Sequence, residues 1–131
     1  MKRVVSVSLG SSSRDYRIVV ELLGEQVSIE RVGANGDVRR ARDLYRALDG
    51  QVDCFGIGGA VLTFQALDRS YEMRAVRRMI SCVQQTPVVD GFGFKDVVER
   101  RVAGFILRHL GHLLQRKSVL VTSAVDRLGL A

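Results

Sequence analysis

A serine-rich loop near the N-terminus is the first group of residues that could bind a ligand. Gly10, Ser11, Ser12 and Ser13 follow a run of β-branched residues, and their hydroxyls and backbone amides could hold a phosphate, a carboxylate or a polyol. The loop is not a Walker loop, because the pattern GxxxxGK[ST] is absent. A hydrophilic turn that binds nothing is the alternative interpretation.

A second loop gathers two carboxylates and a lysine between a predicted strand and a predicted helix. Asp90, Lys95 and Asp96 could bind a polyhydroxyl ligand, hold a metal ion through the carboxylates, or supply a Lys/Asp pair for proton transfer. The structural alternative is that Asp90 caps the turn, Asp96 supports the helix N-terminus and Lys95 is solvated. These three are the candidate catalytic residues.

Two further clusters follow predicted buried strands. Gly56, Gly58 and Gly59 match part of the dinucleotide fingerprint GxGxxG, but the sixth position is a valine, so tight backbone packing competes with cofactor contact as their role. Asp126 and Arg127 could bind a charged substrate or form a salt bridge with each other.

The cysteines, the charge and the hydropathy exclude several classes of protein. Cys54 and Cys82 lack a CxxC partner and a histidine at metal-ligand spacing, which predicts structural thiols and no metal site. The net charge of +6 comes from basic residues spread along the chain without interleaved aromatics, which argues against nucleic acid as a partner. No signal peptide or membrane span is recognised, and we expect a cytoplasmic protein.

Hydrophobic periodicity predicts the elements that position these loops. The most clearly defined helix runs from Val38 to Leu48, with Asp37 as its N-cap and Gly50 after its end. The other predicted elements are strands at 3–10, 17–24 and 25–33, a strand at 52–59, an extended arm or hairpin followed by a helix at 72–84, a strand from 86, a helix at 95–114 and a strand at 118–123.

This order of elements predicts an α/β fold with three layers and a mixed sheet, in which an N-terminal antiparallel hairpin precedes parallel strands. The 131 residues suffice for a single α/β domain, 1–131. Because a strand near the C-terminus leads into no further unit, we expect the chain to be the N-terminal part of a longer one, or to be covered there by a partner or by a second copy in a homo-oligomer.

Five segments together resemble one family. They are MKRVVSVSLGSSSRDYRIVVELLGE, VSIERVGANGD, LDGQVDCFGIGG, TPVVDGFGFKDVVERR and VLVTSAVDRLGLA. In these segments the chain resembles the N-terminal portion of bacterial proteins, chiefly from Firmicutes, that are named quinate dehydrogenase. The NVTxPxK segment of the well-understood quinate and shikimate dehydrogenases is absent, so no residue is assigned a role by motif.

The resemblance implies the substrate-side part of an NAD- or NADP-dependent dehydrogenase that oxidises an alicyclic hydroxy acid, with a cofactor domain beyond Ala131. On this hypothesis the fragment alone is inactive. The alternative hypothesis is a small phosphate- or nucleotide-binding module resembling the actin-like and ribonuclease-H-like folds, without dehydrogenase activity. In that hypothesis Gly10 to Ser13 hold phosphate and Asp90 holds a metal.

Overall fold

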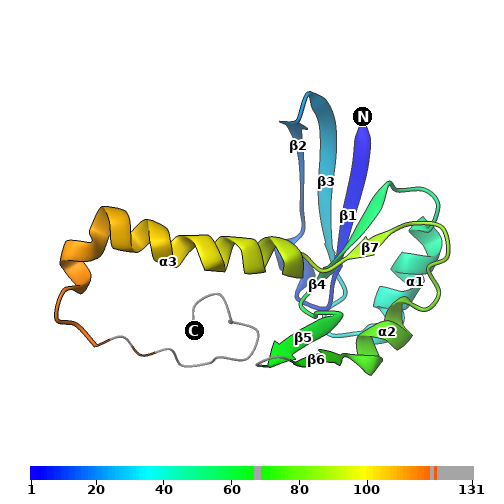
Figure 1. The fold of residues 1–131 in the computed structure, drawn as a ribbon. Coiled ribbons are helices and arrows are strands. Elements are labelled where there is room, and N and C mark those ends of the chain that lie inside the picture. Colours follow the sequence, from blue (N-terminus) through cyan, green and yellow to red (C-terminus); the bar gives the residue numbers. More distant parts are fainter. Residues whose placement is uncertain (67–68, 119, 121–131) are drawn as a thin grey trace. The chain divides into compact units, whose positions relative to one another are not determined.

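The computed structural model describes residues 1–66, 69–118 and 120 (Figure 1). The chain divides into two compact units. Unit 1 contains Met1–Leu62 and Met73–Asp90, and unit 2 contains Thr63–Glu72 and the residues from Gly91 onward. The predicted site residues Asp126 and Arg127 lie outside the described residues.

Unit 1 contains a five-stranded mixed sheet with the order β2-β3-β1-β4-β7. Its central strand β1 pairs in parallel with β3 and with β4, β4 pairs in parallel with β7, and β2 and β3 form an antiparallel hairpin. The predicted mixed sheet and α/β class are therefore confirmed. The strands are β1 (Lys2–Ser8), β2 (Tyr16–Leu22), β3 (Glu25–Gly33), β4 (Cys54–Gly58) and β7 (Val88–Val89).

The hairpin turn has a positive φ at both of its central residues, and of the two only Gly24 adopts that conformation without a steric cost. Leu23 and Gly24 connect β2 to β3 with φ angles of 52° and 79°. Two consecutive positive φ angles are typical of a type I′ turn, whose twist matches that of the paired strands. The turn fixes the register in which Val20 lies opposite Val27.

Helix α1 (Val38–Leu48) has the predicted bounds and cap. The Asp37 carboxylate accepts hydrogen bonds from the amides of Arg39 at 2.8 Å and Arg40 at 3.1 Å. These are two of the donors that every helix N-terminus leaves without an internal partner.

Helix α2 (Arg74–Ile80) is shorter than the predicted 72–84. The Asp49 carboxylate accepts the amides of Gln84 at 2.7 Å and Thr86 at 2.9 Å, and it also accepts the amide of Gln85. A side chain from the end of α1 thus holds residues 84–86 in a turn. The helix therefore ends earlier than the spacing of the apolar residues predicts.

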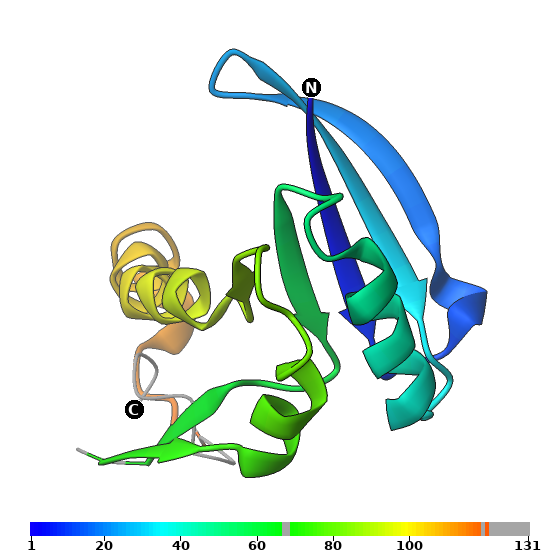
Figure 2. The same cartoon turned by 90° about the vertical axis from the view of Figure 1, so that its right-hand side faces the viewer.

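The core of unit 1 lies between one face of the sheet and the two helices (Figure 2). Tyr45 of α1 packs edge-to-face on Phe55 of β4, with ring centroids 5.1 Å apart. Both helices cover this one face, so unit 1 by itself contains two of the three predicted layers. The buried core side chains include Val5, Val7, Ala41, Tyr45, Phe55, Ile57, Val76, Met79 and Ile80.

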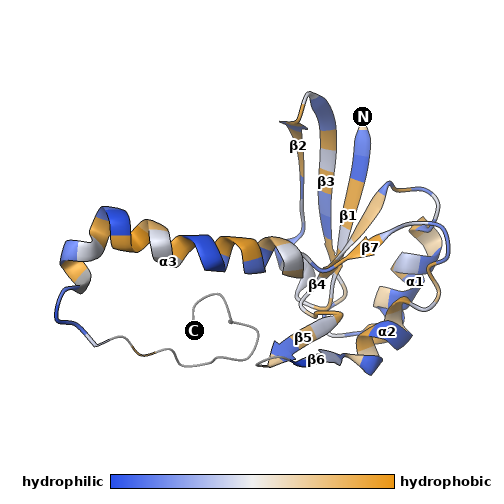
Figure 3. Cartoon of the chain, in the orientation of Figure 1, coloured by the Kyte–Doolittle hydropathy of each residue, from blue (hydrophilic) through white to orange (hydrophobic). Residues whose placement is uncertain are grey.

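Unit 2 contains a hairpin and a long helix. Strands β5 (Thr63–Ala66) and β6 (Arg69–Glu72) form an antiparallel hairpin, one of the two alternatives predicted for this segment, with Phe64 stacked on Tyr71. Helix α3 (Phe92–Leu114) begins earlier than the predicted residue 95 and carries apolar and polar side chains along its length (Figure 3).

Two further predictions concern the strand at 118–123 and helices that could cross a membrane. Most of the predicted strand at 118–123 lies outside them, and Ser118 and Leu120 have no regular structure. In residues 1–66, 69–118 and 120, no helix combines the length and the hydropathy needed to cross a bilayer.

The Tyr45–Phe55 contact predicts a large effect of truncation. Phe55→Ala should lower the free energy of unfolding by about 3–5 kcal/mol, because it leaves a cavity where a fully buried ring packs. Urea denaturation followed by circular dichroism measures this change. The control Phe94→Ala removes a ring that is 78% exposed and should cost less than about 0.5 kcal/mol. Equal effects of the two substitutions would contradict the assigned core.

The turn held by Asp49 predicts a pH dependence. The Gln84 amide, with those of Thr86 and Gln85, holds the pKa of Asp49 below its usual value of 3.8. The stabilisation is therefore fully present above that value and is lost as the pH falls through the lowered pKa. Asp49→Asn should remove this acid-dependent loss in urea denaturation at a series of pH values. Asp43→Asn, on the exposed face of α1, should keep it.

Candidate functional site

The carboxyl ends of four parallel strands lie at one edge of the sheet in unit 1. The chain leaves β1 toward the β3 side and later crosses to β4 on the opposite side of β1. The strand order therefore reverses between β1 and β4, which is the position where open α/β sheets bind ligands. The loops that follow these two strands begin at Leu9 and Gly59.

Backbone hydrogen bonds join the loops after β1, β3 and β4 into one layer. The Leu9 amide donates to the Gly58 carbonyl at 3.0 Å. In the other direction, the amides of Asn35 and Gly36 donate to the carbonyls of Gly10 and Leu9 at 3.0 and 2.7 Å. The start of the serine loop is thus held from both sides.

Asn35 fixes the serine loop through its side chain. Its Oδ1 accepts the Ser12 amide at 2.7 Å, and its Nδ2 donates to the Ser12 Oγ at 3.0 Å. Asn35 has a φ of 56°, in the left-handed region that asparagine tolerates better than most residues. One residue therefore supplies both the turn after β3 and the two contacts to Ser12.

Arg31 and Asp15 form an ion pair beneath the loop. Arg31 Nη1 donates to Asp15 Oδ1 at 2.8 Å and to the Ser11 carbonyl at 3.0 Å, and Arg31 Nη2 donates to Ser8 Oγ at 3.0 Å. The Arg31 side chain is 14% exposed. The Asp15 carboxylate also accepts the Gly33 amide at 2.7 Å. This one guanidinium links β3, the end of β1 and the serine loop.

A second guanidinium lies above Gly10. The Nη2 atoms of Arg14 and Arg31 lie 2.6 and 2.9 Å from the point that a Cβ on Gly10 would occupy. Two cationic groups thus share the space left by one missing side chain. Arg14 is exposed, and its side chain has no ion pair or hydrogen-bond partner among the described residues. The Asp15 carboxylate neutralises the charge of Arg31, whereas the charge of Arg14 is not balanced by a carboxylate among the described residues.

The groups of the serine loop that can contact a ligand are its hydroxyls and the Arg14 guanidinium group. The backbone amides, which the sequence also suggests as ligand contacts, already donate within the protein. The amides of Ser12 and Ser13 donate to Asn35 Oδ1 and to Ser11 Oγ, and the Gly10 amide donates to Ser8 Oγ. The short helix η1 (Ser12–Arg14) is capped in this way by Ser11. The Ser11 and Ser13 hydroxyls are exposed and lie 2.8 Å apart.

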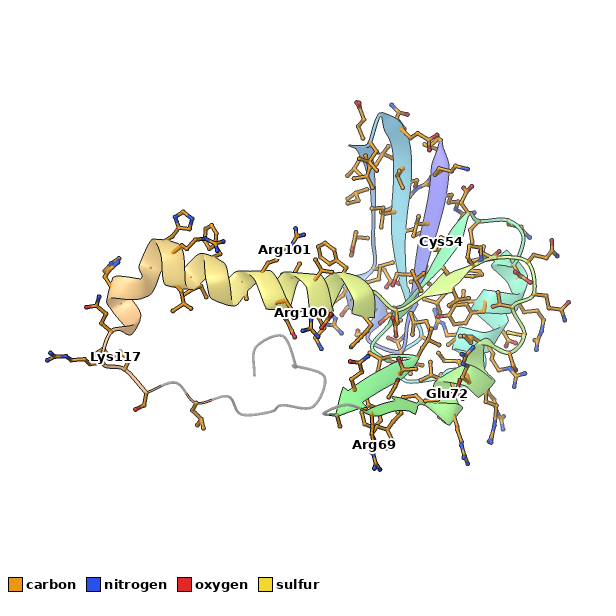
Figure 4. The ribbon with its side chains drawn as sticks, viewed as in Figure 1. Cys54, Arg69, Glu72, Arg100, Arg101 and Lys117 are labelled. Carbon is orange, nitrogen blue, oxygen red and sulfur yellow. The ribbon has the colours of Figure 1, made fainter. Side chains whose placement is uncertain are left out.

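The three candidate catalytic residues belong to two units. Asp90 follows β7 in unit 1, and its Oδ2 accepts the Leu62 amide at 2.8 Å. Lys95 and Asp96 lie near the start of α3 in unit 2. Asp96 accepts hydrogen bonds from Arg100 Nε at 2.9 and 3.1 Å, an interaction that raises the pKa of Arg100. Arg100 is labelled on α3 in Figure 4.

The predicted cofactor glycines have close side-chain neighbours across the β1–β4 pair. A Cβ on Gly58 would lie 2.6 Å from Ser8 Cβ, and one on Gly56 would lie 3.3 Å from Ser6 Cβ. Gly59 has a φ of 72° and lies against Gly10 and Leu9. Close packing therefore accounts for the absence of side chains at positions 56 and 58.

Three residues of this site, Arg14, Arg31 and Asn35, were not among the predicted site residues. In the sequence these three resemble ordinary surface residues. The parallel pairing of β1 with β3 brings Arg31 and Asn35 to the serines, whereas Arg14 directly follows Ser13. The described residues hold no group of three or more histidine, cysteine or acidic side chains that could bind a metal. Burial raises the pKa of the Cys54 thiol on β4, which disfavours a reactive thiolate there.

Comparisons with known proteins give one family and no activity. The sequence model of a domain of unknown function, DUF8753, matches residues 3–90, so the match ends with the last residue of unit 1 and includes the serine loop. No curated protein and no solved structure matches the chain.

The packing of Gly58 predicts a cost that is independent of any ligand. Gly58→Ala should lower the free energy of unfolding by about 1–3 kcal/mol, because neither Cβ of the facing pair can move without shifting a strand. Chemical denaturation without added ligand measures this. Gly93→Ala, which meets no atom within 4 Å, is the matched control and should leave stability unchanged or raise it slightly. If Gly58→Ala proves as stable as the wild type, the packing role is disproved.

Proposed function

The chain belongs to the DUF8753 family of domains of unknown function, and from its geometry we propose that it binds a small anionic ligand at the loop after β1. The ligand carries a phosphate or a carboxylate, which Arg14 and the hydroxyls of Ser11 and Ser13 contact. The observation that carries the proposal is the convergence of the Arg14 and Arg31 guanidinium groups over Gly10.

The charges at this loop favour an anion. Two guanidinium groups are balanced by a single carboxylate, that of Asp15, and the surplus charge resides on the exposed Arg14. Planar guanidinium groups donate paired hydrogen bonds to carboxylate and phosphate oxygens. A bound anion would relieve the repulsion between two like charges held close together.

The surrounding hydrogen bonds favour a site that is formed before a ligand arrives. Asn35 holds Ser12, and Arg31 holds the Ser11 carbonyl and Ser8. Binding would therefore order little more than the Arg14 side chain. A site that is organised in advance loses less entropy on binding, which raises affinity.

A quinate- or shikimate-type dehydrogenase is the narrower form of this proposal. Its alicyclic hydroxy acid would place a carboxylate at Arg14 and hydroxyls at the serines. NAD or NADP as cofactor, and Lys95, Asp90 and Asp96 as catalytic residues, rest on the resemblance and on residue types. A phosphate- or nucleotide-binding module is the other form, with the same cation and the same hydroxyls.

The proposal predicts that Arg14→Gln weakens anion binding by about tenfold or more, since a charge-assisted hydrogen bond contributes about 1.5–3 kcal/mol. Isothermal titration calorimetry at constant ionic strength should use inorganic phosphate, ATP with magnesium, quinate and shikimate as separate probes. Arg78→Gln on α2 is the matched control, because it removes another exposed arginine and should bind as the wild type does.

The outcomes separate the two forms of the proposal. Binding of quinate or shikimate favours the hydroxy-acid form, and binding of phosphate or ATP favours the phosphate module. If none of the four probes binds, or if Arg14→Gln binds as tightly as Arg78→Gln, the proposed anion site is wrong.

A further inference from the structure

Strand β2 presents an open edge and apolar side chains. It is the terminal strand of the sheet order, and none of the described residues pairs with its outer side. Tyr16, Ile18, Val19 and Leu22 are 52%, 45%, 55% and 57% exposed. An exposed edge of this length and hydropathy is a template for pairing with another strand, and natural edge strands are normally protected against it.

The charged residues of β2 are placed symmetrically about its centre. Arg17 and Glu21 lie two positions before and after Val19, so all three point to the same face of the sheet. Ile18 and Val20 lie one position to each side and point to the other face. The sequence is therefore complementary to itself when it is read in the opposite direction.

We infer that β2 pairs antiparallel with β2 of a second copy, about a two-fold axis at Val19. This register places Arg17 opposite the partner's Glu21 and Ile18 opposite the partner's Val20. By symmetry each of these contacts occurs twice, as an interface related by a two-fold axis requires. Opposite charges and paired β-branched residues are the combinations that stabilise neighbouring strands.

Neighbouring registers lack this match. An axis at Ile18 would place Glu21 opposite the partner's Asp15, which brings two carboxylates together. An axis at Val20 would place Glu21 opposite the partner's Val19 and Arg17 opposite the partner's Leu23, in the turn. The charges thus select one register of self-pairing, and the two five-stranded sheets become one continuous sheet. The inference does not depend on the proposed anion site.

Charge reversal tests the register. Arg17→Glu would place two carboxylates opposite each other at both charged pairs, and Glu21→Arg would place two guanidinium groups there. Each variant alone should dimerise about tenfold or more weakly than the wild type, whereas an equimolar mixture of the two brings opposite charges together again and should form a heterodimer. Sedimentation velocity over a concentration series measures this. Arg39→Glu, at an exposed position of α1, is the control for net charge and should still dimerise.

A cysteine at the axis gives an independent measurement. Val19→Cys would face its own copy and should form a disulfide-linked dimer on mild oxidation, whereas Leu23→Cys in the turn should not. Arg17→Glu also removes the 3.1 Å hydrogen bond from Arg17 Nε to Ser28 Oγ. Circular dichroism therefore serves as the control that each variant is folded. A wild type that stays monomeric at every concentration, or a mixture no better associated than its components, would overturn the inference.

Discussion

The loops at the carboxyl edge of the sheet depend on the hydrogen bonds that the Arg31 guanidinium group donates. It donates to the Asp15 carboxylate, the Ser8 hydroxyl and the Ser11 carbonyl. Hydrogen bonds to charged groups contribute more than neutral ones, and a side chain with 14% exposure loses part of its solvation on folding. Arg31 therefore has to satisfy its donors within the protein, and in doing so it positions the serine loop and sets the local charge balance that Arg14 makes positive.

Small residues make this arrangement sterically feasible. A Cβ on Gly33 would lie 2.6 Å from the Ser11 carbonyl carbon and the Ser12 nitrogen, so the serine loop crosses the end of β3 only because position 33 has no side chain. Gly10 in turn admits the two guanidinium groups, and Gly58 admits the Ser8 side chain. The glycines of this edge are therefore linked to one another through the loop that they accommodate.

Local patterns made part of the fold and of the site predictable. The bounds of α1 follow from the Asp37 cap, the β2–β3 hairpin follows from Gly24, and the serines are visible as polar residues after a predicted strand. The end of α2 was not predictable, because it depends on the Asp49 carboxylate binding residues 84–86. Arg31 was missed for the same reason, since its role depends on β3 lying parallel to β1. Long-range contacts of this kind leave no periodic signal in the sequence.

The parallel pairing of β1 also constrains the order in which the chain can fold. Lys2 is in register with Val27 and Val4 with Cys54, so the central strand meets its neighbours only after long loops close. The β2–β3 hairpin needs only a two-residue turn and can form first. During synthesis β1 emerges before either partner exists, and it remains an unpaired apolar strand until the hairpin offers it an edge. The residues that complete the serine loop would then be assembled by the docking of β1, late rather than early.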